Sequence, residues 1–290
     1  KIMNNIATKL LERNFLLFIT IVLFIVMYVA GLIVFKDKNF GNTQVFFNLF
    51  TSNAGLIIVS VGMTLVLITG GIDISVGSVV AVTSMMLAAM MEKANMGVVP
   101  AIIIVLLFGI VFGAVQGWLI SYLNIQPFIV TLAGMFFARG LTAVISLEMI
   151  SITNKTFLAI AQNKIHLPFG GYVNKKGVMI YPYVYPTVIL AILTVVITYW
   201  MLKYTKFGRS IYALGGKEQS ALLMGLNVKR TKLYVYIING FLATLGGIAF
   251  CLNTTGAFVE LAKGFEMDAI AATVIGGTPL TGGVGNVFGT

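Results

Sequence analysis

The 290-residue chain has few of the side chains that build catalytic or metal sites. It contains one cysteine, Cys251, one histidine, His166, and nine acidic residues in all. One cysteine allows no internal disulfide, and one histidine cannot form a metal site or a catalytic relay alone. We therefore expect Cys251 to be an inert packing residue and His166 a loop residue, and we expect no catalytic residue, metal or cofactor.

The chain also lacks the phosphate-binding pattern Gly-x-x-x-x-Gly-Lys-Ser/Thr. This glycine-rich loop holds the phosphates of ATP in P-loop ATPases. The sequence therefore predicts that the chain does not hydrolyse ATP itself.

Charged residues of either sign are scarce. They make up 10% of the chain, against 59% hydrophobic residues and a mean hydropathy of +0.99, whereas about a quarter of a soluble domain is charged. The net charge of +10 lies in segments between long apolar runs, which is typical of the cytoplasmic loops of membrane proteins. We therefore expect a partner surface of membrane lipid and no nucleic acid.

The apolar runs predict an all-α fold, a polytopic transmembrane helical bundle that forms a single permease-sized domain over residues 1–290. A bilayer core needs about 20 apolar residues of helix. The run from 53 to 91 is too long for one span, and the Gly-Gly pair at 70–71 divides it. The predicted spans are 14–35, 53–69, 76–91, 98–120, 127–147, 182–202, 233–252 and 267–289.

Basic residues set the predicted orientation. Residues 1–13 carry three basic residues and one acid, which places the N-terminus in the cytoplasm. Six spans later the chain returns to the same side at the loop 203–232, which holds seven of the nineteen basic residues and one acid, Glu218. The segment from 148 to 181 then lies outside, although it also carries four lysines.

Two glycine-interrupted segments, 70–78 and 275–285, lie in the two halves of the chain. Unwound backbone at membrane depth is tolerated only inside protein or along a water-filled cavity, and a matched pair of breaks indicates a translocation path. Close helix packing and tight turns are the alternative. If the breaks line a path, we expect Thr278 and Thr281 of the second segment to contribute to it.

Asp73, in the first break, is the sharpest single candidate. An ionisable group within a span is costly, so function is its default interpretation. The alternative is that Asp73 caps the next helix, as could Ser75, because both residue types are favoured at that position. The sequence leaves a path role for Asp73 and Ser75 and a capping role open.

Arg139 lies twelve residues beyond Pro127, or about 18 Å along a helix, and so within the bilayer. It either lines the path or reaches outward to the headgroups. Glu266 and Asp268 open the last glycine-rich run, where acids complement the dipole of a helix.

Within the basic loop 203–232, residues 217–224 predict a short helix that Gly225 ends. Eight residues cannot cross a bilayer. The helix carries the apolar cluster Leu222, Leu223 and Met224 in a polar setting, which marks an interaction site. The alternative is an interfacial helix whose basic neighbours contact anionic lipid.

Four motifs, in order, resemble the membrane permeases of bacterial ABC importers for simple sugars, of the ribose and galactofuranose type. The run at 131–140 resembles the galactofuranose branch more closely. The chain departs from the pattern at Pro279, where Ser, Thr or Leu is expected, and at Met224, where Ser is common. The motifs are Gly-Gly-Ile-Asp-Ile-Ser-Val-Gly-Ser at 70–78, Thr-Lys-Phe-Gly-Arg at 205–209 with Tyr-Ala-Leu-Gly-Gly at 212–216, Leu-Met-Gly-Leu-Asn-Val at 223–228, and Asp-Ala-Ile-Ala at 268–271 followed by Val-Ile-Gly-Gly at 274–277.

This resemblance implies a bundle of about ten helices that continues beyond Thr290 and pairs with a second permease, identical or paralogous. A pair of cytoplasmic ATP-binding subunits would drive transport of a monosaccharide such as galactofuranose or ribose, which a periplasmic sugar-binding protein would deliver. The helix within 203–232 would be the coupling helix that fits a groove in the ATPase. The coupling residues implied are Gly215, Gly216, Glu218, Leu222, Leu223 and Gly225.

Three other functions stay open from the sequence. ABC permeases for nucleosides or branched-chain amino acids share related architecture. A proton-coupled secondary transporter could use Asp73. An intramembrane enzyme has the least support, because no cluster of His, Cys and Asp is apparent on facing helices.

Overall fold

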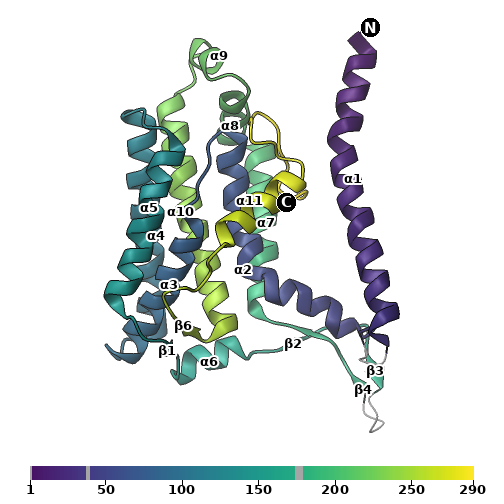
Figure 1. Cartoon of the computed structure of the whole chain (residues 1–290), viewed down its shortest axis with the longest axis vertical. Coiled ribbons are helices and arrows are strands. Elements are labelled where there is room, and N and C mark those ends of the chain that lie inside the picture. Colours follow the sequence, from purple (N-terminus) through teal and green to yellow (C-terminus); the bar gives the residue numbers. More distant parts are fainter. Residues whose placement is uncertain (1, 37–39, 174–178) are drawn as a thin grey trace.

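The computed structural model describes residues 2–36, 40–173 and 179–290. Within them the fold is an all-α bundle, as predicted, with short strand pairs gathered at one end (Figure 1). The helices are α1 (Ile2–Val34), α2 (Thr43–Ile68), α3 (Val76–Glu92), α4 (Val98–Tyr122), α5 (Pro127–Ile145), α6 (Lys155–Ala161), α7 (Pro186–Tyr204), α8 (Lys206–Gly216), α9 (Glu218–Leu223), α10 (Val228–Thr254) and α11 (Phe265–Ile275). The strands pair antiparallel, β1 (Ile150–Ser151) with β6 (Gly256–Ala257), β2 (Ile165–His166) with β5 (Tyr183–Val184), and β3 (Tyr172–Val173) with β4 (Met179–Ile180).

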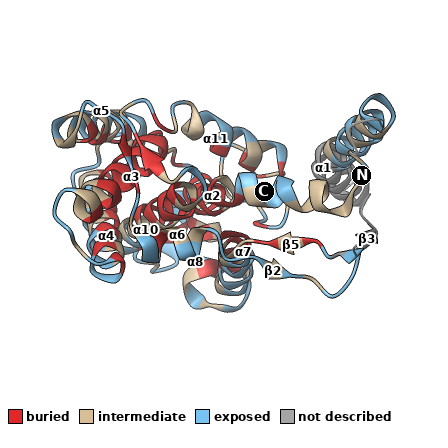
Figure 2. Cartoon of the chain, turned by 90° about the horizontal axis from the view of Figure 1, so that it is seen from below, coloured by how far each residue is buried: buried red, intermediate tan, exposed pale blue. Residues whose placement is uncertain are grey.

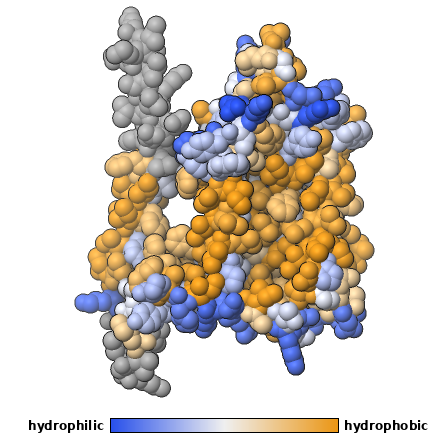
Figure 3. Space-filling view, turned by 180° about the vertical axis from the view of Figure 1, so that it is seen from behind, coloured by the Kyte–Doolittle hydropathy of each residue, from blue (hydrophilic) through white to orange (hydrophobic). Residues whose placement is uncertain are grey.

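Five of the described helices are long and apolar enough to cross a bilayer, namely α2, α4, α5, α7 and α10. An apolar band runs between two hydrophilic ends of the molecule (Figure 3), as expected for helices with lipid on their outer faces. Two further predicted spans fall on α1 and α3, whose described apolar stretches, 18–34 and 76–92, are shorter. The five long helices contain most or all of the predicted spans 53–69, 98–120, 127–147, 182–202 and 233–252.

The core forms where α10 packs between α4, α2 and α3. Buried residues concentrate in these four helices (Figure 2). Glycines let α4 and α10 approach closely, since a Cβ on Gly113 would collide with the carbonyl of Tyr236 and one on Gly240 with the carbonyl of Gly109. Small residues at such spacing are a usual device for membrane helix packing.

Two helices begin earlier than predicted. The predicted start of α2 at 53 is wrong, because the mixed polar and apolar stretch from Thr43 is already helical. The amide of Gln44 hydrogen-bonds both backbone groups of Tyr183, at 2.8 and 3.1 Å. Helix α10 begins at Val228 rather than at 233, because the side-chain oxygen of Asn227 accepts a hydrogen bond from the Arg230 N–H at 3.0 Å and caps it.

The predicted last span, 267–289, is also wrong. Helix α11 has 11 residues and ends at Ile275, so it is about 16 Å long and too short to cross a bilayer. Gly277, Gly282 and Gly283 have φ of 95°, 75° and 80°, left-handed values that end the helix. The chain after Ile275 instead turns back against the end of α2.

The two basic segments lie at the same end of the molecule. The start of α1 and the helices α8 and α9 are together at one end, and α6 with the strand pairs is at the other (Figure 1). That residues 1–13 and 203–232 share the cytoplasmic side of a membrane stays a prediction.

Candidate functional site

The first glycine break separates α2 from α3. Helix α2 ends at Ile68, and Gly70 follows with a left-handed φ of 77°. Gly71 is buried, and a Cβ there would lie 2.7 Å from the hydroxyl oxygen of Tyr236. Residues 70–75 then run from the end of the bundle into its interior, where α3 begins (Figure 1).

A buried polar network centres on Asp73, which is 2% exposed. Its Oδ1 accepts hydrogen bonds from the backbone N–H and the hydroxyl of Ser75, at 2.9 and 2.6 Å. Its Oδ2 accepts one from the side-chain amide of Asn239 at 2.7 Å, and Gln116 donates to the Ser75 hydroxyl at 3.1 Å. The network therefore ties the break to both α4 and α10.

No ion pair neutralises Asp73 among the residues the structure describes. Its carboxyl oxygens instead accept hydrogen bonds from Ser75 and Asn239. Asn239 and Gln116 were not predicted from the sequence. The signal that could have found them is an amide side chain within an otherwise apolar span.

The capping prediction is partly wrong. Ser75 is the N-cap residue of α3, but its side chain makes no capping hydrogen bond, because the hydroxyl donates to Asp73 instead. Asp73 binds the N–H of Ser75 and so fixes the turn that precedes the helix. The role of Asp73 and Ser75 in lining a path stays a prediction.

 The two glycine breaks meet in space with a third glycine segment. Ile68, the last residue of α2, and Gly276, the first residue after α11, are 208 positions apart in the sequence. The Gly283 N–H donates a hydrogen bond to the Ile68 carbonyl at 2.8 Å. Gly215, in α8, lies so close that an added Cβ would collide with the same carbonyl and with the Gly283 nitrogen. We call Ile68, Gly215 and Gly283 the glycine junction. The matched breaks thus contact each other and α8 directly.

The predicted residues of the second break differ in exposure. Thr278 is fully buried, and its hydroxyl has no hydrogen-bond partner within the described part of the chain. Thr281 is exposed. Neither donates to the Asp73 network, so the two predicted groups of path residues are not brought into one polar cluster. Their contribution to a path stays a prediction.

The structure places Arg139 against the loop that precedes α11, and its part in lining a path stays a prediction. Its guanidinium donates to the carbonyls of Val259 and Leu261 at 2.7 and 2.8 Å and so fastens α5 to the loop that precedes α11. In the same loop the pKa of Glu260 is lowered, mainly because Lys263 donates a hydrogen bond to its carboxylate at 2.8 Å.

The acids of α11 lie in its first turn, as predicted. A Cβ on Gly77 would lie 3.2 Å from the Glu266 nitrogen, so the N-terminal ends of α3 and α11 meet inside the bundle. Asp268, two residues further along the same turn, is exposed. Cys251 is buried as predicted, whereas His166, predicted in a loop, lies in the two-residue strand β2.

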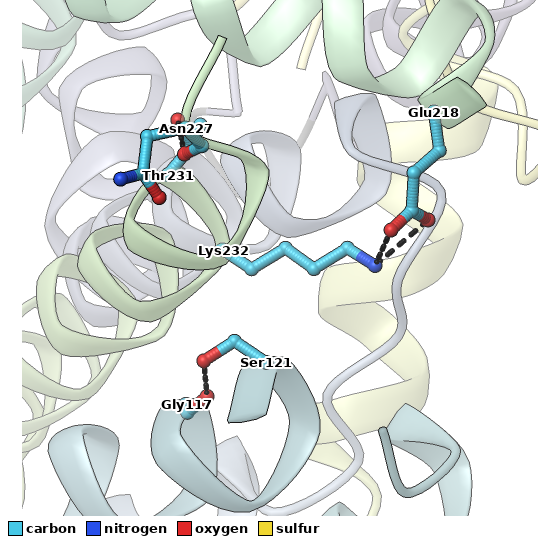
Figure 4. A network of polar contacts seen from close by, with 6 residues as sticks. All are labelled: Gly117, Ser121, Glu218, Asn227, Thr231 and Lys232. Atoms are coloured by element: carbon cyan, nitrogen blue, oxygen red, sulfur yellow. Dashed lines mark hydrogen bonds and ion pairs between the residues drawn. The ribbon is translucent and has the colours of Figure 1, made fainter. Parts of the chain in front are cut away.

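The predicted coupling helix is present as α9. It begins at Glu218, and the left-handed Gly225, with φ of 77°, follows its C-terminal end. Its buried Ala221 packs with Leu214 of α8 and Val228 of α10. Both carboxylate oxygens of Glu218 lie 2.8 Å from the ammonium of Lys232 on α10 (Figure 4). Glu218 therefore holds α9 against the bundle.

The outer side of α9 is apolar. Leu222, Leu223 and Met224 are 55%, 87% and 65% exposed, and we call these three residues the α9 tip. Gly216, at the end of α8, has no atom near the position that a Cβ would take. Of the two predicted glycines in α8, only Gly215 therefore lacks room for a Cβ. The part of these residues in coupling stays a prediction.

Comparison with known proteins identifies the family. Residues 45–290 match the family described as "Branched-chain amino acid transport system / permease component". The chain is 40% identical over 281 residues to the inner membrane ABC transporter permease protein YjfF of Escherichia coli, covering 97% of this chain and 81% of that protein. It is 40% identical to the fructose import permease protein FruG of Bifidobacterium longum, covering 93% and 77% of the two chains.

A third relative is the ribose import permease protein RbsC of Escherichia coli, 37% identical over 88% of this chain and 75% of its own. No solved structure matches the chain. These findings confirm the resemblance to sugar permeases of ABC transporters. The chain belongs to this family of transporter permease components, as a multi-pass membrane protein built from α-helices.

Proposed function

We propose that the chain is the membrane-spanning subunit of an ATP-driven importer that conducts a monosaccharide into the cytoplasm. The names of two of its relatives support a sugar, since they refer to fructose and ribose import. Galactofuranose or ribose, as predicted from the sequence, falls within that class. The chain performs no bond chemistry in this role, and ATP hydrolysis comes from separate subunits.

We place the chain in the inner membrane with its N-terminus and the loop 203–232 in the cytoplasm. The positive-inside bias supports this orientation, because both segments are basic and lie at the same end of the molecule. Residues 1–290 act as one permease domain, with 203–232 as its coupling loop. A second permease, identical or paralogous, completes the path, and a periplasmic sugar-binding protein delivers the substrate.

The α9 tip is the observation that carries the coupling proposal. Three large apolar side chains are exposed at the polar, basic end of the molecule, where lipid tails do not cover them. Apolar surface with a polar rim marks a protein contact. We therefore infer that the α9 tip inserts into a groove of the cytoplasmic ATP-binding subunit.

The glycine junction supports a route from that contact to the membrane interior. Helix α9 directly follows the C-terminal end of α8, where Gly215 contacts the carbonyl of Ile68 at the first break and Gly283 at the second. A displacement of α8 must therefore move both breaks, because packed backbone cannot deform smoothly. We infer that ATP-driven closure of the partner ATPases opens the path through this contact.

We place the path along the exposed face of α11. Asp268 is exposed on a half-helix that begins beside α3 inside the bundle, and an ionisable side chain at that depth is costly against lipid. Thr281 is exposed beyond the same helix. The buried Asp73, Ser75 and Thr278 then lie behind the exposed residues that line the path.

A charge placed on the α9 tip tests the proposal. The variant Leu223→Asp should lose ATP-driven sugar uptake and binding of the ATP-binding subunit, because burying an unpaired carboxylate in a groove is costly. Gln219→Asp adds the same charge to the same helix at an exposed position and should retain both. Uptake and subunit binding by Leu223→Asp at the level of Gln219→Asp would refute the coupling assignment.

A further inference from the structure

A half-open hollow of about 420 Å³ lies beside the glycine junction. Its walls come from α7, α8 and the segment after α11. Lys203 and Arg209 line one part of it, and the backbone of Gly276 and Gly285 lines another. The proposed function assigns no role to this hollow.

The lining carries two cations and no acidic side chain. The Lys203 ammonium hydrogen-bonds the Tyr199 hydroxyl at 2.9 Å and lies 5.3 and 5.4 Å from the ring centres of Tyr199 and Tyr204. Neither Lys203 nor Arg209 takes part in an ion pair within the described ranges of the chain. Two positive charges thus face one hollow, and no acidic side chain that the structure describes pairs with them.

The position of the hollow favours an anion from the membrane surface. It lies at the end of span α7, next to the basic segment 203–232 and a cluster of tyrosines. Tyrosines mark the headgroup level of a bilayer, and basic pockets between helices on the cytoplasmic side bind anionic headgroups. Arginine and lysine are the usual phosphate-binding side chains.

We propose that this hollow binds an anionic phosphate group, of the kind that a phosphatidylglycerol headgroup or a soluble phosphate ester carries. Lys203 and Arg209 supply the charge, and the amide of Asn286 supplies a neutral donor.

A phosphate group bound in the hollow would stabilise the glycine junction. The hydroxyl of Tyr212, which also lines the hollow, donates to the Gly285 carbonyl at 2.9 Å and so already joins α8 to the segment after α11. A phosphate held by Lys203 and Arg209 would add α7 to this link. If the proposed transport function holds, an anionic ligand here regulates the movement of both breaks.

Binding to the purified permease in neutral-lipid nanodiscs tests the site without sugar or ATPase, so its result is independent of the proposed function. The probes are short-chain phosphatidylglycerol, short-chain phosphatidylcholine, glycerol 3-phosphate and inorganic phosphate. The double variant Lys203→Gln/Arg209→Gln should bind the anionic probe at least about tenfold more weakly than the wild type. The matched control, Lys217→Gln/Arg230→Gln, removes the same two charge types from the same end of the molecule, outside the hollow.

Binding of phosphatidylglycerol alone identifies a lipid site, and binding of a soluble phosphate identifies a free-ester site; both support the proposal. Three results overturn it: no binding of any anionic probe, equal binding of phosphatidylcholine, or equal weakening in the control, which would indicate diffuse charge attraction. Elution of each variant as a single species with wild-type helix content shows that the comparison is made on folded protein.

Discussion

Replacing Gly215 by alanine tests whether the glycine junction is as tight as the structure has it. The added Cβ would collide with the carbonyl oxygen of Ile68 and with the nitrogen of Gly283. Both are backbone atoms, so no side chain can rotate away. Forcing one extra carbon into a packed interior costs about 1 to 3 kcal/mol, and losing the hydrogen bond from Gly283 to Ile68 adds about 1 kcal/mol.

We therefore expect Gly215→Ala to lower the free energy of unfolding by about 3 kcal/mol and to abolish transport while the protein still inserts. Gly216→Ala is the matched control, because it lies in the same helix, adds the same carbon and meets no atom. An exchange of glycine for alanine in a helix stabilises by about 0.5 to 1 kcal/mol, so the control should be at least as stable as the wild type.

Thermal unfolding in detergent and sugar uptake in cells measure the two effects. Gly215→Ala should unfold at a lower temperature than Gly216→Ala and should fail to transport. Equal stability and uptake in the two variants would refute the close contact between α8 and the breaks.

Substitutions at three further residues test the polar contacts. Asp73→Ala leaves the donors of Ser75 and Asn239 without their acceptor. We therefore expect the free energy of unfolding to fall by about 1 to 3 kcal/mol for each buried group left unpaired. Asp73→Asn keeps an acceptor and should retain sugar uptake, whereas a proton-coupled carrier would lose uptake in this variant. Arg139→Leu removes two bonds to carbonyls and should lower the free energy of unfolding by about 2 kcal/mol, whereas a thermal stability equal to wild type would show that α5 is held otherwise. Glu218→Gln breaks the ion pair with Lys232 at an exposed site and should cost less than about 1 kcal/mol, so a large loss of stability by calorimetry would contradict the geometry of α9.

The spans were predictable because lipid imposes length and apolarity on every crossing helix. Helices α4 and α5 begin at the predicted residues, Val98 and Pro127. The last span was mispredicted for a local reason: the run 267–289 is apolar enough, but three glycines in left-handed conformations and one proline turn it back. Composition over a window does not resolve such turns.

The site was predictable only in part. The ionisable Asp73 and the short helix ended by Gly225 could be identified, since both break the local apolar pattern. The contact of Gly215 with Ile68 could not, because it joins segments that are far apart in the sequence and uses a backbone carbonyl. The partners Gln116 and Asn239 were likewise missed, since nothing in their own helices indicates that they face Asp73.

The measurement that tests the account most directly is sugar uptake into proteoliposomes that contain the permease and its ATP-binding subunit. The sugar-binding protein and radiolabelled ribose, fructose or galactose are supplied outside and ATP inside. We predict uptake of at least one of these sugars that requires ATP and the ATP-binding subunit and is unchanged by a protonophore. Uptake by the permease alone that a protonophore abolishes would contradict the account.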